Sequence, residues 1–126
     1  MSQIKSFFTG LNQITAKDSR YKEDAYLFLM TALNHVLQKL KEPRHITGQE
    51  LLGGIREEAG SQFGPMASVV FEYWGIKNSL DFGRIVFNMV EEGMLSKTET
   101  DTLEDFRDDL FFQKLFDEAS AYRLSV

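Results

Sequence analysis

The sequence contains no cysteine, and this excludes several kinds of site at once. Without cysteine there are no disulfides, no thiolate zinc sites and no cysteine nucleophiles, and a reducing compartment suits such a chain. Histidine is almost as scarce, with only His35 and His45 among 126 residues. They do not form an H-x₃-H or H-E-x-x-H spacing, so we predict no metal site.

Long apolar runs are also missing. No run approaches the roughly 18 residues that a membrane-spanning helix needs. Residues 1–10 contain one lysine and only short apolar pairs, without the continuous apolar core of a secretory signal. We therefore expect a soluble, cytoplasmic protein with no membrane partner.

Motifs that carry known chemistry are absent too. The sequence has no G-x-S-x-G elbow, P-loop or dinucleotide fingerprint. Asp81-Phe82-Gly83 matches the kinase magnesium triplet in letters, but no glycine-rich loop or His-Arg-Asp loop accompanies it. The neighbouring carboxylates Glu57-Glu58 and Glu91-Glu92 diverge by about 100° on a helix, so neither pair forms a catalytic dyad. We predict no catalytic residues and no cofactor.

What the sequence does contain is helical periodicity. Apolar residues recur at helical spacing along most of the chain. Thr47 and Glu50 form a capping box that begins one helix, and Gly53-Gly54 inside it predicts close packing against another backbone. The predicted fold is mainly α: a single compact helical domain of five or six helices over residues 1–126, with a peripheral N-terminal helix at 1–18 and a core at 20–118. The later helices are expected near 21–41, 47–59, 66–74, 80–92 and 110 onward.

Residues 94–106 have two interpretations. They form either a small winged-helix-like β-hairpin or a loop. In a winged helix, the helix at 80–92 would read nucleic acid with the outward residues Asp81, Arg84, Asn88, Glu91 and Glu92. Three carboxylates and one arginine are a poor match to phosphate, which needs neutralising charge around the recognition helix. Lysines and arginines between residues 5 and 44 offer a basic face on the other side for RNA or the ribosome.

Charge is distributed unevenly along the chain, whose net charge is −5. Residues 99–118 hold eight acidic and two basic side chains, which gives −6 for this segment alone. Such a segment either solvates the surface or docks a basic protein partner. Nucleic acid is an improbable partner because an acidic protein repels a phosphate backbone.

Two further groups of residues are candidate binding sites. Arg44 and His45 form a polar corner before the capping box, where they would bind an anion at the positive end of the helix; alternatively, Arg44 pairs with Glu42 or Glu50. Tyr73 and Trp74 end the helix at 66–74. Tyrosine and tryptophan are favoured interface anchors, but helical spacing also fits a core role, and we predict that Trp74 is buried between this helix and the one at 80–92.

Several stretches together resemble a family of small uncharacterised bacterial proteins. They are PRHITGQELL (43–52), QFGPMA (62–67), WGI (74–76), DFGRIVFN (81–88), LSKT (95–98) and EDF (104–106). The similarity covers residues 20–118 and implies one compact bacterial cytoplasmic domain. It implies no activity.

The sequence therefore ranks three functions. First comes a non-enzymatic protein-interaction or adaptor module, because motifs for catalysis are absent while aromatic residues and an acidic segment are present. A winged-helix-like nucleic-acid or ribosome-associated binding protein is second. An enzyme that uses carboxylates or a histidine is third.

Overall fold

The computed structural model describes the backbone of residues 2–96 and 102–124, and the side chains of 7–96 and 102–117. These residues form six α-helices and two short 3₁₀ helices, so the mainly α fold is confirmed. In chain order they are α1 (Ser2–Lys17), α2 (Glu23–Gln38), α3 (Gly48–Phe63), η1 (Gly64–Met66), α4 (Ala67–Tyr73), α5 (Ser79–Glu91), η2 (Leu103–Phe106) and α6 (Phe111–Leu124). No helix in the described ranges has both the length and the apolarity to cross a membrane.

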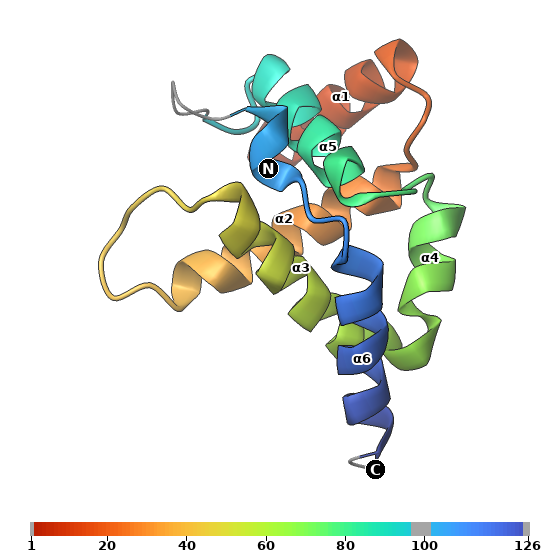
Figure 1. Ribbon diagram of the computed structural model, residues 1–126. Coiled ribbons are helices and arrows are strands. Elements are labelled where there is room, and N and C mark those ends of the chain that lie inside the picture. Colours follow the sequence, from red (N-terminus) through yellow and green to blue (C-terminus); the bar gives the residue numbers. More distant parts are fainter. Residues whose placement is uncertain (1, 97–101, 125–126) are drawn as a thin grey trace.

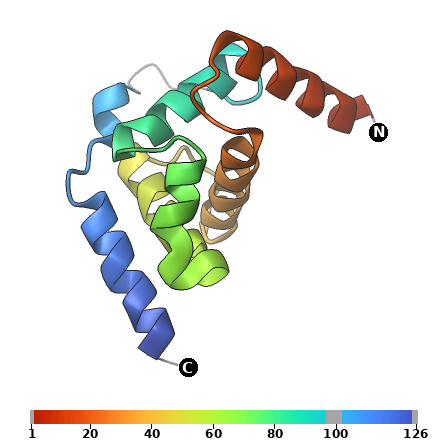
Figure 2. The same ribbon diagram turned by 90° about the vertical axis from the view of Figure 1, so that its right-hand side faces the viewer.

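The helices pack around α3. Helix α6 lies along α3, and α2 packs against α3 from another side (Figure 1). Seen from the side, α4 stands in front, between α6 and α2 (Figure 2). Helix α1 extends away from the body at the opposite end from the tip of α6.

One hydrophobic core joins all six α-helices. Its buried members include Leu11 and Ile14 of α1, which are as inaccessible as the residues of the central helices. Leu11 and Ile14 therefore anchor the second half of α1 in the core. The helix is also continuous through Gly10, although glycine there predicts a short or broken helix. A side chain at Gly10 would meet Met94 within 2.9 Å, so glycine lets the segment after α5 pack against α1.

Caps fix where the helices begin and end. The Thr47–Glu50 capping box is present, and Asn78 and Asp81 form a second one at α5. Each satisfies backbone donors that a helix leaves unpaired at its start. Gly75, which follows α4, has a φ of 91°, which glycine adopts without strain. A side chain there would also lie 2.0 Å from the carbonyl oxygen of Arg20.

The two adjacent glycines of α3 have different environments. A Cβ on Gly54 would lie 2.2 Å from a methyl group of Val36, so this glycine allows α2 and α3 to approach closely. A Cβ on Gly53 would meet only Arg56, at 3.8 Å. The close-packing prediction is confirmed for Gly54 and wrong for Gly53.

The loop interpretation of 94–106 fits the described part of that segment. Residues 94–96 are bends and irregular chain, and 103–106 form η2 instead of a return strand. Residues 97–101 lie outside the described residues. Neither described end of this segment is a β-strand, so the prediction of a winged-helix-like hairpin is wrong for residues 94–96 and 102–106. The reason is that Phe106 is buried in the core, and a capping box between Thr102 and Asp105 closes the tight turn that places it there.

Candidate functional site

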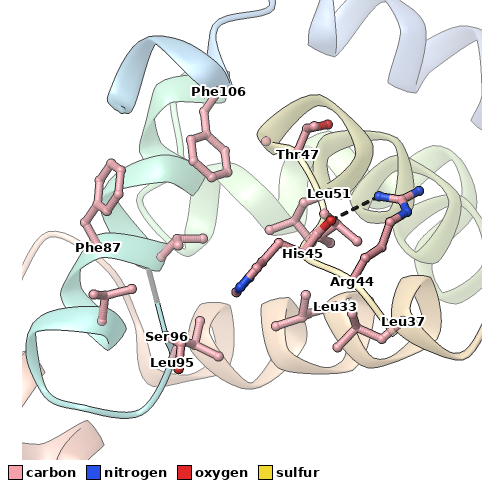
Figure 3. A pocket seen from close by; sticks show the side chains of 14 residues that line it. Leu33, Leu37, Arg44, His45, Thr47, Leu51, Phe87, Leu95, Ser96 and Phe106 are labelled. Atoms are coloured by element: carbon pink, nitrogen blue, oxygen red, sulfur yellow. Dashed lines mark hydrogen bonds between the residues drawn. The ribbon is translucent and has the colours of Figure 1, made fainter. Parts of the chain in front are cut away.

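An apolar groove of about 210 Å³ opens between α2, α5 and the start of α3. Figure 3 shows side chains from these separate segments converging on it. Its apolar lining consists of Leu33, Leu37, Ile46, Leu51, Val86, Phe87, Val90, Leu95 and Phe106. Pockets for drug-sized ligands measure roughly 300–1,000 Å³, so this groove is sized for a single large side chain.

Polar groups surround the groove on the side of the α2–α3 connection. Arg44, His45, Thr47 and Ser96 line it together with the apolar residues. Figure 3 shows the His45 ring directed from the connection toward the α5 side of the groove. An apolar floor with a few polar groups at the edge is the usual composition of a recognition pocket.

Arg44 is held by an internal partner. Its guanidinium donates to both carboxylate oxygens of Glu50, at 3.0 and 2.8 Å. Glu50 also accepts from the backbone N–H of Thr47 at 2.9 Å, as the capping box requires. The hydrogen bonds from Arg44, with that of Thr47, lower the pKa of Glu50 to about 2. Pairing of Arg44 with Glu50 is thus confirmed, and the anion site remains a prediction.

Helix η2 closes one end of the groove. The side-chain amide of Gln49 donates to the backbone carbonyls of Asp105 and Arg107, at 3.1 and 2.9 Å. These bonds hold η2 against the start of α3 and so position Phe106 in the groove wall. The sequence shows no pattern that pairs residue 49 with residues 105–107, which lie more than 50 positions later.

A second polar site is centred on the buried carboxylate of Asp81. Tyr21 donates its hydroxyl to Asp81, and Arg84 donates at 2.9 Å. The backbone N–H groups of Lys77 and Asn78 add bonds of 2.7 and 3.2 Å. Burial by itself raises the pKa of Asp81, but these hydrogen bonds outweigh it and lower the pKa. Burial, and then the bond to Asp81, raises the pKa of Tyr21.

This network corrects the proposed recognition face of α5. Asp81 is buried, and Arg84 is bound to it instead of facing outward. Asn88 donates to Asp18 and to the Tyr26 hydroxyl, both at 3.0 Å. Three of the five residues expected to face nucleic acid therefore hold α5 to residues 18–26 and to its own first turn.

Most of the described cations of the predicted basic face also have carboxylate partners. Lys17 pairs with Glu92, Arg20 with Asp18, Lys39 with Glu57, and Arg44 with Glu50. On α2, the imidazole ring of His35 makes a hydrogen-bonding contact with the Glu58 carboxylate. These pairs reduce the positive charge available for phosphate.

The acidic segment 99–118 is partly neutralised in the same way. The carboxylate of Asp108 lies 2.9 Å from Lys114 and 3.5 Å from Arg56, and Glu104 pairs with Arg107. Asp109 is strongly exposed, and its carboxylate lies 3.7 Å from the same Arg107 guanidinium. Residues 99–101 lie outside the described residues. Residues 102–109, which include the groove residue Phe106, hold four carboxylates and one arginine.

Tyr73 and Trp74 have opposite environments. Trp74 is buried, as predicted, but its ring neighbours are Phe28 of α2, Phe63 of α3 and Phe71 of α4. The ring that packs against Phe82 of α5 is Phe71, and Trp74 belongs to the same core cluster as the buried residues of that helix. Tyr73 is strongly exposed, with the Lys22 ammonium 5.6 Å from the centre of its ring.

No cluster of three metal-ligating side chains occurs in the part of the chain that the structure describes. No family model, curated protein or solved structure matches this chain. The resemblance to a bacterial family therefore stays a prediction, and the functional argument depends on the groove and the surfaces around it.

Proposed function

We propose that the protein is a non-enzymatic interaction module that binds one apolar side chain of a partner protein in the groove. The observation that carries this proposal is the groove itself, a cavity of about 210 Å³ with nine apolar lining residues. Binding energy at protein interfaces is concentrated in such desolvated pockets. Burying a leucine or phenylalanine there would contribute roughly 1.5–3 kcal/mol.

The charge beside the groove favours a basic partner segment. Helix η2 brings Glu104 and Asp105 next to Phe106, and both are exposed. Lysine or arginine residues flanking the apolar anchor would meet this acidic edge, which would speed association and select against acidic partners. The proposal thus includes the basic partner that the charge of residues 99–118 predicts.

The two other functions have weaker support. Nucleic-acid binding has less support because three residues of the predicted recognition helix, Asp81, Arg84 and Asn88, form hydrogen bonds within the protein. Catalysis by Asp81 and Tyr21 is disfavoured by the direction of their pKa shifts, which make the carboxylate a weaker base and the phenol a weaker acid. Perturbed pKa values also arise in structural networks such as this one.

Three short peptides test the proposal when titrated into the ¹⁵N-labelled protein and followed by NMR. The first carries one leucine flanked by lysines, the second an alanine flanked by lysines, and the third a leucine flanked by glutamates. We expect the first to shift the amide signals of Leu33, Val86 and Leu95. The alanine peptide should bind about 10- to 100-fold more weakly, and the glutamate peptide should also bind more weakly.

A matched pair of variants on α2 locates the binding site. Leu37→Glu places a charge in the groove, whereas Leu27→Glu makes the same change outside it, and the two leucines are 42% and 39% exposed. Binding should be lost in the first variant and retained in the second. Equal effects of the two variants, or no signal shifts with the leucine–lysine peptide, would overturn the proposal.

A further inference from the structure

A stripe of exposed apolar side chains runs along η1 and α4, on the side away from the core. Met66, Val69 and Tyr73 are 55%, 54% and 71% exposed, and their spacing of three and four residues places them on one face. Figure 2 shows α4 at the front of the molecule, between α6 and α2. Phe116 of α6, which packs along η1 and α4, is 63% exposed.

The fold itself does not need apolar residues at these positions. Helix α4 is attached to the core by Ala67, Phe71 and the Trp74 ring that follows it, all of which are buried. Polar side chains at 66, 69 and 73 would leave these contacts unchanged. Exposed apolar stripes of this kind typically mark an interaction surface.

The charge around the stripe distinguishes it from the rest of the surface. Residues 59–71 contain no charged side chain, although the whole chain has a net charge of −5. Two copies of an acidic protein repel one another where acidic surfaces meet. The uncharged segment around Met66 and Val69 avoids that repulsion, and in a two-fold interface the same patch of both copies must be compatible with itself.

The margins of the stripe add complementarity between two copies. Lys22 lies at one margin, against the Tyr73 ring, and Glu72 is exposed on α4 beside it. In a two-fold arrangement the lysine of each copy can pair with the glutamate of the other. We propose that this stripe, defined as Met66, Val69 and Tyr73, is the surface through which two copies of the protein associate.

The small size of the stripe limits the expected affinity of the dimer. From residue 66 to 73 the stripe is only about 10 Å long, at 1.5 Å per helical residue. Stable interfaces bury about 800 Å² on each partner, and smaller ones are weak and transient. We therefore expect a weak, reversible dimer that dissociates on dilution.

Sedimentation equilibrium of the full chain over a range from about 1 μM to 1 mM tests this inference. The average mass should rise with concentration from 14.5 kDa toward twice that value. Val69→Lys should weaken dimerisation at least tenfold. Gln38→Lys, which makes a cationic change at an exposed position of α2, should change it less than twofold.

Lysine at position 69 also lowers the net negative charge, so a loss of dimer cannot arise from greater overall repulsion. The fluorescence of Trp74 would verify that both variants fold. A protein that stays monomeric at 1 mM would overturn the inference. So would a dimer that Val69→Lys does not weaken, since the copies would then meet elsewhere. Because the groove is a different surface, Val69→Lys should leave peptide binding intact, and the two proposals can fail independently.

Discussion

The carboxylate of Asp81 is buried and accepts hydrogen bonds from two side chains and two backbone N–H groups. As an acidic residue in the first turn of α5, it would usually be a solvated side chain that favours the positive end of the helix. The structure adds a second function, because the same carboxylate accepts from Tyr21 and Arg84 inside the protein. A residue 60 positions away contributes one of these bonds, so helix periodicity cannot predict it.

Asp81→Asn should destabilise the protein by roughly 3 kcal/mol at pH 7, since it removes a buried charge and weakens its hydrogen bonds. The pKa of Asp81 is lowered in the folded state, below the unfolded value of about 3.9. Its contribution is therefore complete well above the unfolded pKa and is lost as the pH falls through the lower, folded pKa. The unfolding free energies of the variant and the wild type, measured with urea, should accordingly converge as the pH is lowered below about 4.

Asp109→Asn provides the control for this pH dependence, because the Asp109 carboxylate is strongly exposed. It should change stability by no more than about 0.5 kcal/mol across the same range. A difference between Asp81→Asn and wild type that does not shrink as the pH falls below about 4 would contradict the charged role of Asp81.

Trp74 is buried and its neighbour Tyr73 is exposed, so alanine substitutions at these two positions should change stability by different amounts. Trp74→Ala should cost roughly 3–5 kcal/mol because it empties a space between aromatic rings of α2, α3 and α4. Tyr73→Ala should stay within about 1 kcal/mol, since its side chain is exposed. Chemical denaturation followed by circular dichroism measures both. Native tryptophan emission at the wavelength of a solvent-exposed indole would contradict the core position.

At the scale of elements, the sequence predicts the helices well and their ends less well. The starts of α3 and α5 follow from side-chain caps that the sequence shows directly. The end of α3 was expected near residue 59 but extends to Phe63, with Gly60 buried inside the helix. Tertiary packing outweighs the weak helix propensity of glycine there. The ring partners of Trp74 have the same limit, because they depend on how α2 packs against the end of α3.

The pair Gly53 and Gly54 tests the contact between α2 and α3. Gly53→Ala should stabilise the protein by up to about 1 kcal/mol, because alanine favours the helix and the site has room. Gly54→Ala gains the same propensity but forces a methyl group against Val36, so it should be destabilising. Thermal unfolding of both variants gives the comparison.

Val36→Ala should reverse the sign of the stability change caused by Gly54→Ala, because it removes the methyl group with which the new side chain would collide. In that background Gly54→Ala is expected to be neutral or stabilising. If the two glycine variants behave alike in the native background, the close approach of α2 and α3 at Gly54 is wrong.

At the scale of the whole molecule, the groove combines segments that are distant in sequence. Arg44 and His45 could be predicted because they precede a recognisable capping box. The apolar lining could not, because Leu33, Val86 and Phe87 have the same helical periodicity as core residues. Only the packing of α2 against α5 determines which apolar residues are covered and which line an open cavity.

The shared core has a consequence for how the protein unfolds. All six α-helices contribute buried residues to one cluster, and this includes α1, which was expected to be peripheral. We predict a single cooperative transition, in which Trp74 fluorescence and helical circular dichroism change at the same denaturant concentration.

Leu11→Ala should lower the free energy of unfolding by about 2–5 kcal/mol. It should shift the midpoints of both signals together, although Leu11 belongs to α1 and Trp74 follows α4. Phe8→Ala, at a half-exposed position of the same helix, should have a much smaller effect. If Leu11→Ala lowered the circular dichroism signal while the Trp74 transition stayed in place, α1 would unfold separately from the rest of the core.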